Sequence, residues 1–312
     1  MTTRREFYWR YAGALLLLIT LLMVWAGPKN AMAAQSPSGD WFGAGKLTLY
    51  ANHNGAAQCL SAVMEDGNGG VIVIDGGWQG DSDFLLDQIK QKGGHVSAWL
   101  LTHPHSDHVG ALIGILNNHA NEITIDNIYY SFLDDAWYQE KDQEAWNNVY
   151  GLRQAFSKLS QEKLHGDIYA GQRINLGNIT VQVLNSAYKL NSDFVNNSSV
   201  AYLVEMNGTK VVFLGDLGHS GGEQLMKDVD LASLGCDIVQ MAHHGQNGVG
   251  YEVYKALRPK VCIWPTPQWL WDNDNGGGYN SGNWTTLETR QWLVRLGVKE
   301  SYCIKDGDQV IE

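Results

Sequence analysis

Three histidines and one aspartate lie within six residues of this 312-residue chain, directly after an apolar run. The run Ala98–Thr102 is typical of a strand, and it is followed by His103-Pro104-His105-Ser106-Asp107-His108. Imidazole and carboxylate groups are ligands of borderline divalent metals, and a loop can direct several of them at adjacent ions. Separate surface histidines do not explain this density. We therefore expect a metal site at the C-terminal end of a strand.

Two later apolar runs end in residues of the same kind. Phe213-Leu214-Gly215-Asp216 ends in a carboxylate, and the run 238–241 is followed by Ala242-His243-His244-Gly245. In an extended strand, consecutive side chains point to opposite faces, so only one of the two histidines is expected to bind metal. We favour His244 as the ligand and expect His243 to orient water or to contact substrate oxygens. Taken alone, Asp216 could instead cap a helix.

The order of apolar and turn segments predicts an α/β fold in layers. The expected strands are Lys46–Asn52, Ala57–Met64, Val71–Asp75, Ala98–Thr102, Ile125–Tyr130, Ile179–Leu184, Val200–Met206, Lys210–Leu214, Asp237–Met241 and Val261–Trp264. The expected helices run from Asp81 or Ser82 to about Lys92, from about Val109, and over Asp134–Gln161, Gly222–Lys227, Tyr251–Leu257 and Thr286–Leu296. Asn207-Gly208 has the composition of a type I′ hairpin turn. Two such halves packed face to face give a four-layer αββα sandwich.

The first 34 residues resemble a targeting segment rather than part of the fold. Basic residues precede an apolar run over residues 12–26, and Ala31-Met32-Ala33 offers the small residues of a cleavage site. An uncleaved membrane anchor is the alternative. We expect residues 35–40 to form a linker, residues 41–312 to form one domain, and the protein to be secreted or held on the extracellular face of the membrane. Contact with the membrane is expected only through this N-terminal segment.

Net charge limits the substrates expected for this chain, and the cysteine spacing limits the structural sites. The formal net charge is −11, and removing residues 1–34, with four basic residues and one acidic residue, changes it to −14. Such a chain repels polyanions unless a metal reverses the local field, so nucleic acid is disfavoured but possible, and a small or cell-surface substrate is favoured. The four cysteines include no Cys-x-x-Cys pair, which argues against a structural zinc site and leaves two disulfides or four buried thiols open.

The six residues at positions 103–108 match the His-x-His-x-Asp-His signature and resemble the metallo-β-lactamase superfamily. The resemblance covers roughly residues 45–305 and implies a one- or two-metal site. His103 and His105 then serve one metal, the pair Asp107 and His108 serves the other, and Asp216 bridges both. One of His243 and His244 completes the second site. The cofactor implied is a divalent metal, one or two Zn²⁺ ions, with Mn²⁺ or iron as alternatives because these ligands accept all three.

One departure from the superfamily pattern points to a branch. Most members supply a third histidine about 20 residues before the bridging aspartate, where this chain has Asn196-Asn197-Ser198-Ser199. This replacement resembles the extracellular hydrolase domain of the competence protein ComEC, a branch associated with phosphodiester cleavage. Asn197 or water then completes the first site, and Asn197 is also expected near the substrate. His165 could substitute by looping back, but a solvated turn residue is preferred.

The aromatic tract that follows Trp264 is the expected source of specificity. Its rings and glycines predict a mobile loop over the site that stacks on a base or sugar, or that holds a quaternary ammonium by cation–π attraction beside Asp272 and Asp274. A plug over a sheet end is the plain alternative. The candidate substrate-binding residues of this tract are Trp269, Trp271, Tyr279 and Trp284.

The ligand set predicts hydrolysis by a metal-activated water, without a serine or cysteine nucleophile. Asp107, Asp216 and His243 are the candidate catalytic residues, since the two carboxylates can orient the attacking water and one can accept its proton. A phosphodiesterase is the leading hypothesis, and a phosphorylcholine-type esterase or a lactonase or β-lactamase are the alternatives. The non-enzyme alternative is a surface-binding protein with a decayed metal site.

Overall fold

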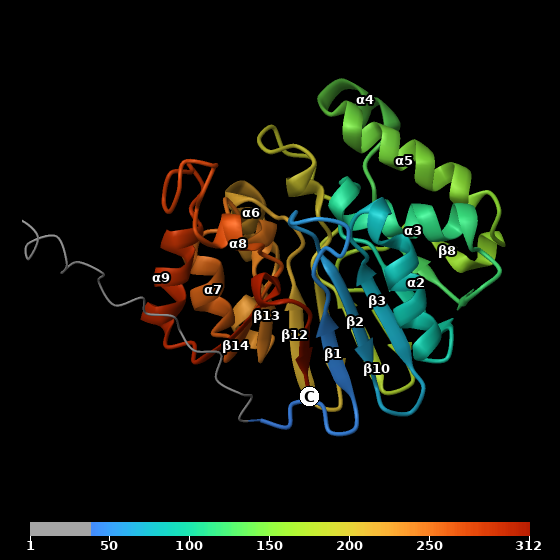
Figure 1. Cartoon of the computed structure of the whole chain (residues 1–312), viewed down its shortest axis with the longest axis horizontal. Coiled ribbons are helices and arrows are strands. Elements are labelled where there is room, and N and C mark those ends of the chain that lie inside the picture. The colour runs from blue at the N-terminus through green and yellow to red at the C-terminus, as the bar shows by residue number, and fades with distance from the viewer. Residues whose placement is uncertain (1–38) are drawn as a thin grey trace, which may run out of the picture. The chain divides into compact units, whose positions relative to one another are not determined.

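The computed structural model describes residues 39–312, which form two seven-stranded sheets with helices on their outer faces (Figure 1). The expected export segment and most of the linker lie outside the described residues. In spatial order, the first sheet contains β16 (Gln309–Ile311), β1 (Lys46–Leu49), β2 (Ser61–Glu65), β3 (Val71–Asp75), β5 (Ala98–Leu100), β7 (Ile128–Tyr129) and β8 (Leu164–His165). The second contains β15 (Glu300–Cys303), β14 (Val261–Trp264), β13 (Ile238–Gln240), β12 (Thr209–Phe213), β11 (Tyr202–Met206), β10 (Ile179–Val183) and β9 (Arg173–Leu176). A separate pair joins β4 (His95–Val96) to β6 (Thr124–Ile125).

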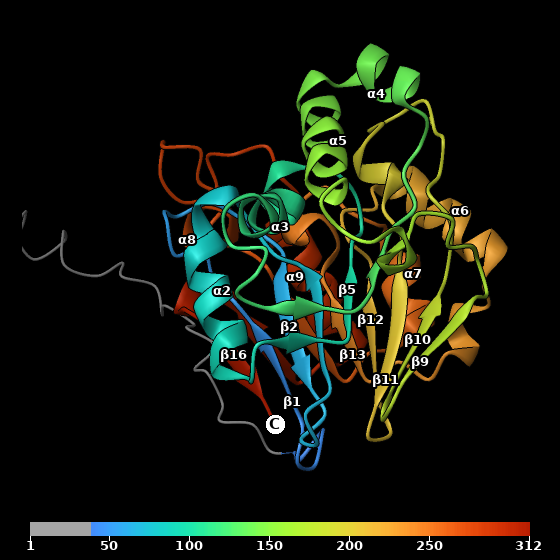
Figure 2. The same cartoon turned by 90° about the vertical axis from the view of Figure 1, so that its right-hand side faces the viewer.

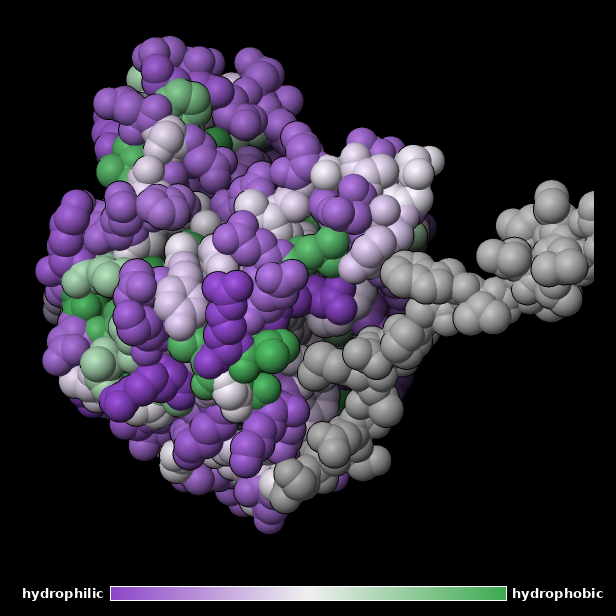
Figure 3. Space-filling model, turned by 90° about the vertical axis from the view of Figure 1, so that its left-hand side faces the viewer, coloured by the Kyte–Doolittle hydropathy of each residue, from purple (hydrophilic) through white to green (hydrophobic). Residues whose placement is uncertain are grey.

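The helices divide between the two outer layers. Those of the first half are α2 (Ser82–Gln91), α3 (Ser106–Asn118), α4 (Asp135–Lys141) and α5 (Gln143–Phe156), and Figure 2 shows α2, α3 and α5 in front of the first sheet. Those of the second half are α6 (His219–Asp228), α7 (Tyr251–Leu257), α8 (Gln268–Trp271) and α9 (Thr286–Leu296). The face of the molecule on the α9 side is mostly hydrophilic, with only small hydrophobic areas (Figure 3). The four-layer αββα sandwich is confirmed.

Three apolar clusters hold these layers together. The inner faces of the two sheets meet in a buried core that includes Met64, Tyr202 and Phe213. Trp99 belongs to the cluster between the first sheet and its helices, and Trp264 to that between the second sheet and its helices. Because both faces of the central strands are buried, these strands are nearly continuous apolar runs. No helix among residues 39–312 is long and apolar enough to cross a membrane.

Several elements differ from the sequence prediction at their ends. The helix expected from about Val109 begins at Ser106, so that Asp107 and His108 lie in its first turn. The single long helix expected over residues 134–161 is two helices, because Asp142 is extended (φ −157°, ψ 107°) and caps α5. The last three-residue strand, β16, returns to pair with β1 and was not predicted, since so short a segment carries no periodic signal.

The turn at Asn207-Gly208 is as predicted. Its residues have φ of 52° and 89°, and it joins the antiparallel pair β11 and β12. β12, β13 and β14 then run parallel, as do β3, β5 and β7. Parallel strands bring their C-terminal ends to one edge of each sheet. The residues after β3, β5, β12 and β13 are therefore able to converge.

Candidate metal centre

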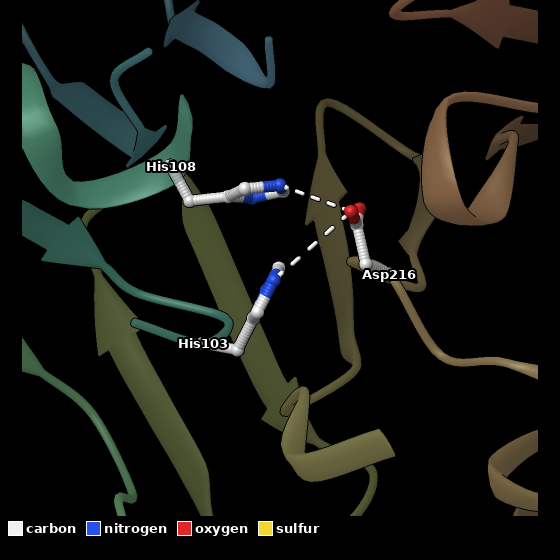
Figure 4. A group of neighbouring side chains, drawn as sticks. All are labelled: His103, His108 and Asp216. Carbon is white, nitrogen blue, oxygen red and sulfur yellow. Dashed lines mark ion pairs between the residues drawn. The ribbon is translucent and has the colours of Figure 1, made fainter. Parts of the chain in front are cut away.

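Asp216 lies at the centre of the cluster and is reached from both halves of the fold. Its Oδ2 lies 3.2 Å from His108 Nε2, 3.1 Å from His244 Nε2 and 4.0 Å from His103 Nε2. Figure 4 shows His103 and His108 pointing toward it. Asp216 follows β12, whereas His103 follows β5 and His108 belongs to α3. The two sheets therefore meet at this carboxylate, as the pattern of strand ends predicts.

Two groups of ligand atoms are close enough to hold metal. The Asp107 Oδ2 lies 3.1 Å from His244 Nε2. The ligand atoms of His103, His108 and Asp216 lie within 4.8 Å of one another, and so do those of Asp107, His108 and His244. These five residues are nearly or fully buried. The structure thus brings together all but one of the six predicted ligands in two groups that share His108.

His105, the sixth predicted ligand, lies at the edge of the cluster. Its Nδ1 lies 2.9 Å from His103 Nε2, and its Nε2 lies 3.9 Å from Asp142 Oδ2. His105 is therefore oriented with Nδ1 toward the other ligands and Nε2 toward a carboxylate. Asp142 stands 37 residues along the chain, and nothing in the sequence pattern pointed to it.

Asp75 is a second residue that the sequence did not mark as functional. Its Oδ2 accepts hydrogen bonds from His108 Nδ1 (2.7 Å) and from Thr102 Oγ1 (2.7 Å), and its Oδ1 accepts one from the Thr102 amide (2.8 Å). The carboxylate thereby fixes the His108 ring with Nε2 toward Asp216. Such partners set the tautomer of a metal ligand. The signal that could have found it is a carboxylate at the end of a wholly buried strand.

His243 and His244 lie in a turn rather than in a strand. β13 ends at Gln240, and both histidines adopt left-handed backbone conformations, with φ of 50° and 55°. The argument from strand alternation is therefore wrong, because the segment is not extended, yet the two rings do diverge. His244 Nδ1 donates to the Pro265 carbonyl (3.0 Å), which leaves Nε2 facing the carboxylates. His243 Nε2 instead accepts from Asn196 Nδ2 (3.3 Å).

The buried ligand atoms of this cluster would fit a cation. Asp216 Oδ1 is buried without a hydrogen-bond partner among the described residues, and the buried Nε2 atoms of His108 and His244 meet carboxylate oxygens at 3.1–3.2 Å without making a hydrogen bond. Buried polar atoms without hydrogen bonds cost free energy, and a cation held between these nitrogens and carboxylate oxygens would satisfy them. Two imidazoles whose other nitrogens are already used, together with the carboxylates of Asp107 and Asp216, would suit a divalent metal ion.

The protonation states of the cluster are strongly displaced in the metal-free protein. Burial opposes a charge on His108, but Asp216, Asp107 and Asp75 outweigh it and raise the pKa well above its usual value. Burial likewise opposes a charge on His244, yet Asp216 and Asp107 raise its pKa to about 9. Burial and the neighbouring His108 and His105 lower the pKa of His103. Protons on His108 and His244 thus stand where a metal binds, and binding must release them.

Other predicted residues lie elsewhere. Asn197 is buried, and its Oδ1 accepts from the amides of Gly218 and Gly221 (2.9 Å each) while its Nδ2 donates to Ser192 (2.6 Å). With its amide engaged on both sides, Asn197 supports a turn instead of contacting metal or substrate, so that prediction is corrected. His165 stacks on Tyr129 and bonds Asn127 Oδ1 (2.9 Å), apart from the cluster.

The aromatic residues of the predicted loop divide into packed and exposed side chains. The Trp271 ring packs on Trp264, and the Arg290 guanidinium lies 4.0 Å from its centre. Trp269 donates from Nε1 to Ala56 (2.8 Å) and packs edge-on against Trp284. Tyr279 is 69% exposed. Trp271 is therefore part of the helix packing and already has a cation of its own chain, whereas Tyr279 is free to meet a ligand.

Comparison with known proteins identifies the fold. Residues 54–162 match the model of the Metallo-beta-lactamase superfamily. The solved metallo-beta-lactamase fold protein YhfI from Bacillus subtilis is 14% identical, with a TM-score of 0.51 over 86% of this chain and 99% of that chain. A mutant of the CmlA beta-hydroxylase is 12% identical, with a TM-score of 0.50 over 89% of this chain and 55% of that one. No curated protein matches the sequence.

The family match and the structural similarities support different conclusions. At such identities, likeness to a solved structure shows the fold alone, and a hydroxylase shares it, so the fold does not by itself select hydrolysis. The sequence match is more specific, because residues 54–162 contain the cluster from His103 to His108. The sequence match to the superfamily is thus confined to residues 54–162, and the solved structures show that the described chain shares the fold.

Proposed function

We propose that this protein is an exported metal-dependent hydrolase that cleaves phosphodiester bonds. The hydrolytic part of this proposal is supported by one observation: the ligand atoms of His103, Asp107, His108, Asp216 and His244 form two adjoining buried groups that share His108. The superfamily is generally made up of hydrolytic metalloenzymes. A decayed site has no reason to keep every one of these groups in register, so the non-enzyme alternative is disfavoured.

The residues of the cluster have different expected roles in the reaction. When bound, a divalent ion lowers the pKa of water from about 15.7 toward 7 and supplies hydroxide at neutral pH. Asp107 and Asp216 are placed to orient the attacking water and to take up its proton. His243 is half-buried beside Asn196, and we expect its ring to orient water or to contact a substrate oxygen.

The proposal of phosphodiester cleavage rests on the absence of the third histidine that most superfamily members have. Where a third histidine is expected, the chain has Asn196, whose Nδ2 bonds His243 and the Asp193 carboxylate (2.8 Å) and whose Oδ1 is buried without a partner. An amide is a weaker metal ligand than an imidazole. The side of the site that contains Asn196 therefore offers hydrogen-bonding groups in place of a third histidine ligand. The resemblance to the ComEC-type hydrolase branch supports the same bond class.

Three substrates separate the candidates. We expect metal-loaded protein to hydrolyse bis-p-nitrophenyl phosphate and to leave nitrocefin intact, with p-nitrophenylphosphorylcholine as the test of the esterase alternative. Cleavage of nitrocefin alone would show that the phosphoester assignment is wrong. The Arg290 side chain already occupies the Trp271 face, so a quaternary ammonium is not favoured there.

Two substitutions test the metal itself. His105→Ala and Asp216→Ala are expected to lose bound metal and turnover together, as measured by elemental analysis and by hydrolysis of the same substrates. Retention of full turnover by Asp216→Ala would exclude the proposed centre. Export is tested separately, by fractionating cells for the full-length and processed chain, since residues 1–38 lie outside the described structure.

A further inference from the structure

Helix α5 holds the metal loop, residues 103–108, by side-chain contacts on both sides of a candidate ligand. Asn148 donates from Nδ2 to the Pro104 carbonyl (2.9 Å) and to Ser106 Oγ (3.1 Å), so both N–H groups of its side-chain amide are used on the loop. Ser106 Oγ donates in turn to Glu144 Oε1 (2.7 Å). His105 stands between Pro104 and Ser106. The residue before this histidine and the residue after it are therefore both tied to α5.

The position of these side chains follows from the start and the packing of α5. Glu144 and Asn148 are four residues apart and so share one face of the helix. Glu144 lies in the first turn, where a helix favours negative charge, and Asp142 caps that turn with its Oδ2 at 3.9 Å from His105 Nε2. The helix is itself fixed, because Leu152 is buried in the cluster between the first sheet and its helices (Figure 2). A rigid element thus supports the loop.

Two other candidate ligands are oriented by parts of the chain outside α5. The Asp75 carboxylate fixes the His108 ring, and the Pro265 carbonyl fixes that of His244. His105 differs, because it is the N-cap residue of α3 and its side chain makes no capping hydrogen bond. The place of the His105 ring therefore depends on the contacts between the loop and α5.

We propose that Asn148 and Glu144 are positioning residues that set the place of His105 and, through it, the affinity of the site for metal. This inference rests on the metal centre of the proposed function and concerns metal binding, not the bond that is cleaved. Both residues act on the loop from outside, through Pro104 and Ser106. Loss of an outer partner of a metal ligand typically lowers metal affinity about 10- to 100-fold.

The test titrates chelator-treated protein with Co²⁺ and follows absorption, so that it needs no substrate. Asn148→Ala removes both donors to the loop and should weaken Co²⁺ binding about tenfold, the lower end of that range, because its contacts with the ligand are indirect. Glu144→Ala should weaken binding in the same direction. Glu144→Gln keeps an acceptor for the Ser106 hydroxyl and should restore the affinity to within about twofold of the wild type.

The matched control is Asn147→Ala, at the next position of α5. Asn147 is exposed and accepts from Gln143 Nε2 (2.9 Å) of the same helix. This substitution therefore removes the same amide from the same helix without changing a contact with the metal loop, and the Co²⁺ affinity should equal that of the wild type.

A double variant separates positioning from a general loss of structure. If Asn148 acts through His105, Asn148→Ala should cause no further loss of Co²⁺ affinity in a His105→Ala background. The absorption spectrum of bound Co²⁺ in Asn148→Ala should also shift toward that of His105→Ala, which a less stable fold alone would not produce. Equal affinities in the wild type and Asn148→Ala, or additive losses in the double variant, would overturn the inference.

The outcomes distinguish this inference from the proposed function. The expected pattern of Co²⁺ affinities supports the positioning role even if no phosphodiester is hydrolysed, in which case the proposed function fails alone. Hydrolysis of bis-p-nitrophenyl phosphate by the wild type, with Co²⁺ affinity unchanged in Asn148→Ala and Glu144→Ala, rejects the positioning role and leaves the proposed function in place.

Discussion

Asn196 and Asn197 are neighbours in sequence whose side chains serve different parts of the molecule. Asn197 satisfies two backbone amides and one carbonyl, whereas Asn196 lies against His243 with a free Oδ1. Sequence alone cannot assign these roles, because in a short turn (Asn196–Ser198) the direction of each side chain depends on tertiary contacts. The two residues therefore make a matched pair for mutation.

Asn197→Ala should destabilise the fold, and Asn196→Ala should impair the site. Removing the Asn197 amide leaves the Gly218 and Gly221 amides unpaired in a buried turn, at a cost of about 2–4 kcal/mol in the free energy of unfolding. Asn196→Ala removes no backbone partner and should change KM or kcat with little loss of stability. Urea unfolding and steady-state kinetics on both variants measure this; the reverse assignment would show that Asn197 contacts substrate.

Asp142 both caps helix α5 and lies beside His105, a candidate metal ligand. Its Oδ1 caps α5 by accepting from the Ala145 amide (2.9 Å), while Oδ2 faces His105 Nε2 at 3.9 Å. Asp142→Asn keeps a good cap but removes the charge beside the imidazole, so metal affinity should fall about 10- to 100-fold with thermal stability of the metal-free protein unchanged.

A neighbouring helix supplies the control for this substitution. Asp134 caps α4 through the Trp137 amide (2.9 Å) and pairs with Lys189, away from the histidines. Asp134→Asn should leave metal affinity as in the wild type. Titration of metal-free protein with Co²⁺, followed by absorption, reads the affinity directly. Equal affinities in wild type and Asp142→Asn would restrict Asp142 to its capping role.

The elements of the fold were largely predictable, and their junctions were not. β3, β14, α7 and α9 have the predicted bounds, because each is a periodic or apolar segment bounded by turn residues. The start of α3 was misplaced by three residues, since polar ligand residues occupy its first turn and hide the apolar period. The residues His103 to His108 could be recognised because they are consecutive in the sequence. Their partners Asp75 and Asp142 could not, because they come close to the cluster only in the folded chain.

Two glycines in neighbouring helices test how tightly α3 is fixed. At Gly110 of α3, an added Cβ would come within 2.4 Å of backbone, whereas at Gly151 of α5 it would meet only Ile113 side-chain atoms, 3.7 Å away at the nearest. Gly110→Ala should therefore cost about 1–3 kcal/mol of stability by overpacking and also weaken metal binding, because the first turn of α3 carries Asp107 and His108. Gly151→Ala should be neutral or stabilise by up to about 1 kcal/mol. Urea unfolding compares them, and equal effects would contradict the packing seen at Gly110.

At the scale of the whole molecule, the four cysteines are buried and unpaired. Burial raises the pKa of Cys236 and of Cys303 to about 12, so neither thiol ionises near neutral pH. We expect four thiols to react with a disulfide reagent in denaturant and none to react rapidly in the native protein. Two or fewer reactive thiols after denaturation would instead indicate disulfides and a different arrangement of these strands.

Metal binding should stabilise the whole fold, and more so at higher pH. In the metal-free protein the folded-state pKa of His244, about 9, lies above its unfolded value of about 6.5. Its protonation therefore contributes stability that is complete below about pH 6.5 and is lost as the pH rises through about 9. Asp216, whose pKa is lowered by His108 and His244 against the effect of burial, changes stability only in acid.

The metal-loaded protein should follow the opposite trend, because metal and protons compete for the same nitrogens. The increase in Tm on adding Zn²⁺ to chelator-treated protein should thus grow between pH 6 and pH 9. With free metal at about 100 times Kd, the stabilisation is about 2.7 kcal/mol, or roughly 4–5 °C for a chain of this size. Differential scanning calorimetry across that range, with Asp216→Ala as the control that should show no shift, measures the effect; a Tm increase independent of pH would mean that His108 and His244 carry no protons to displace.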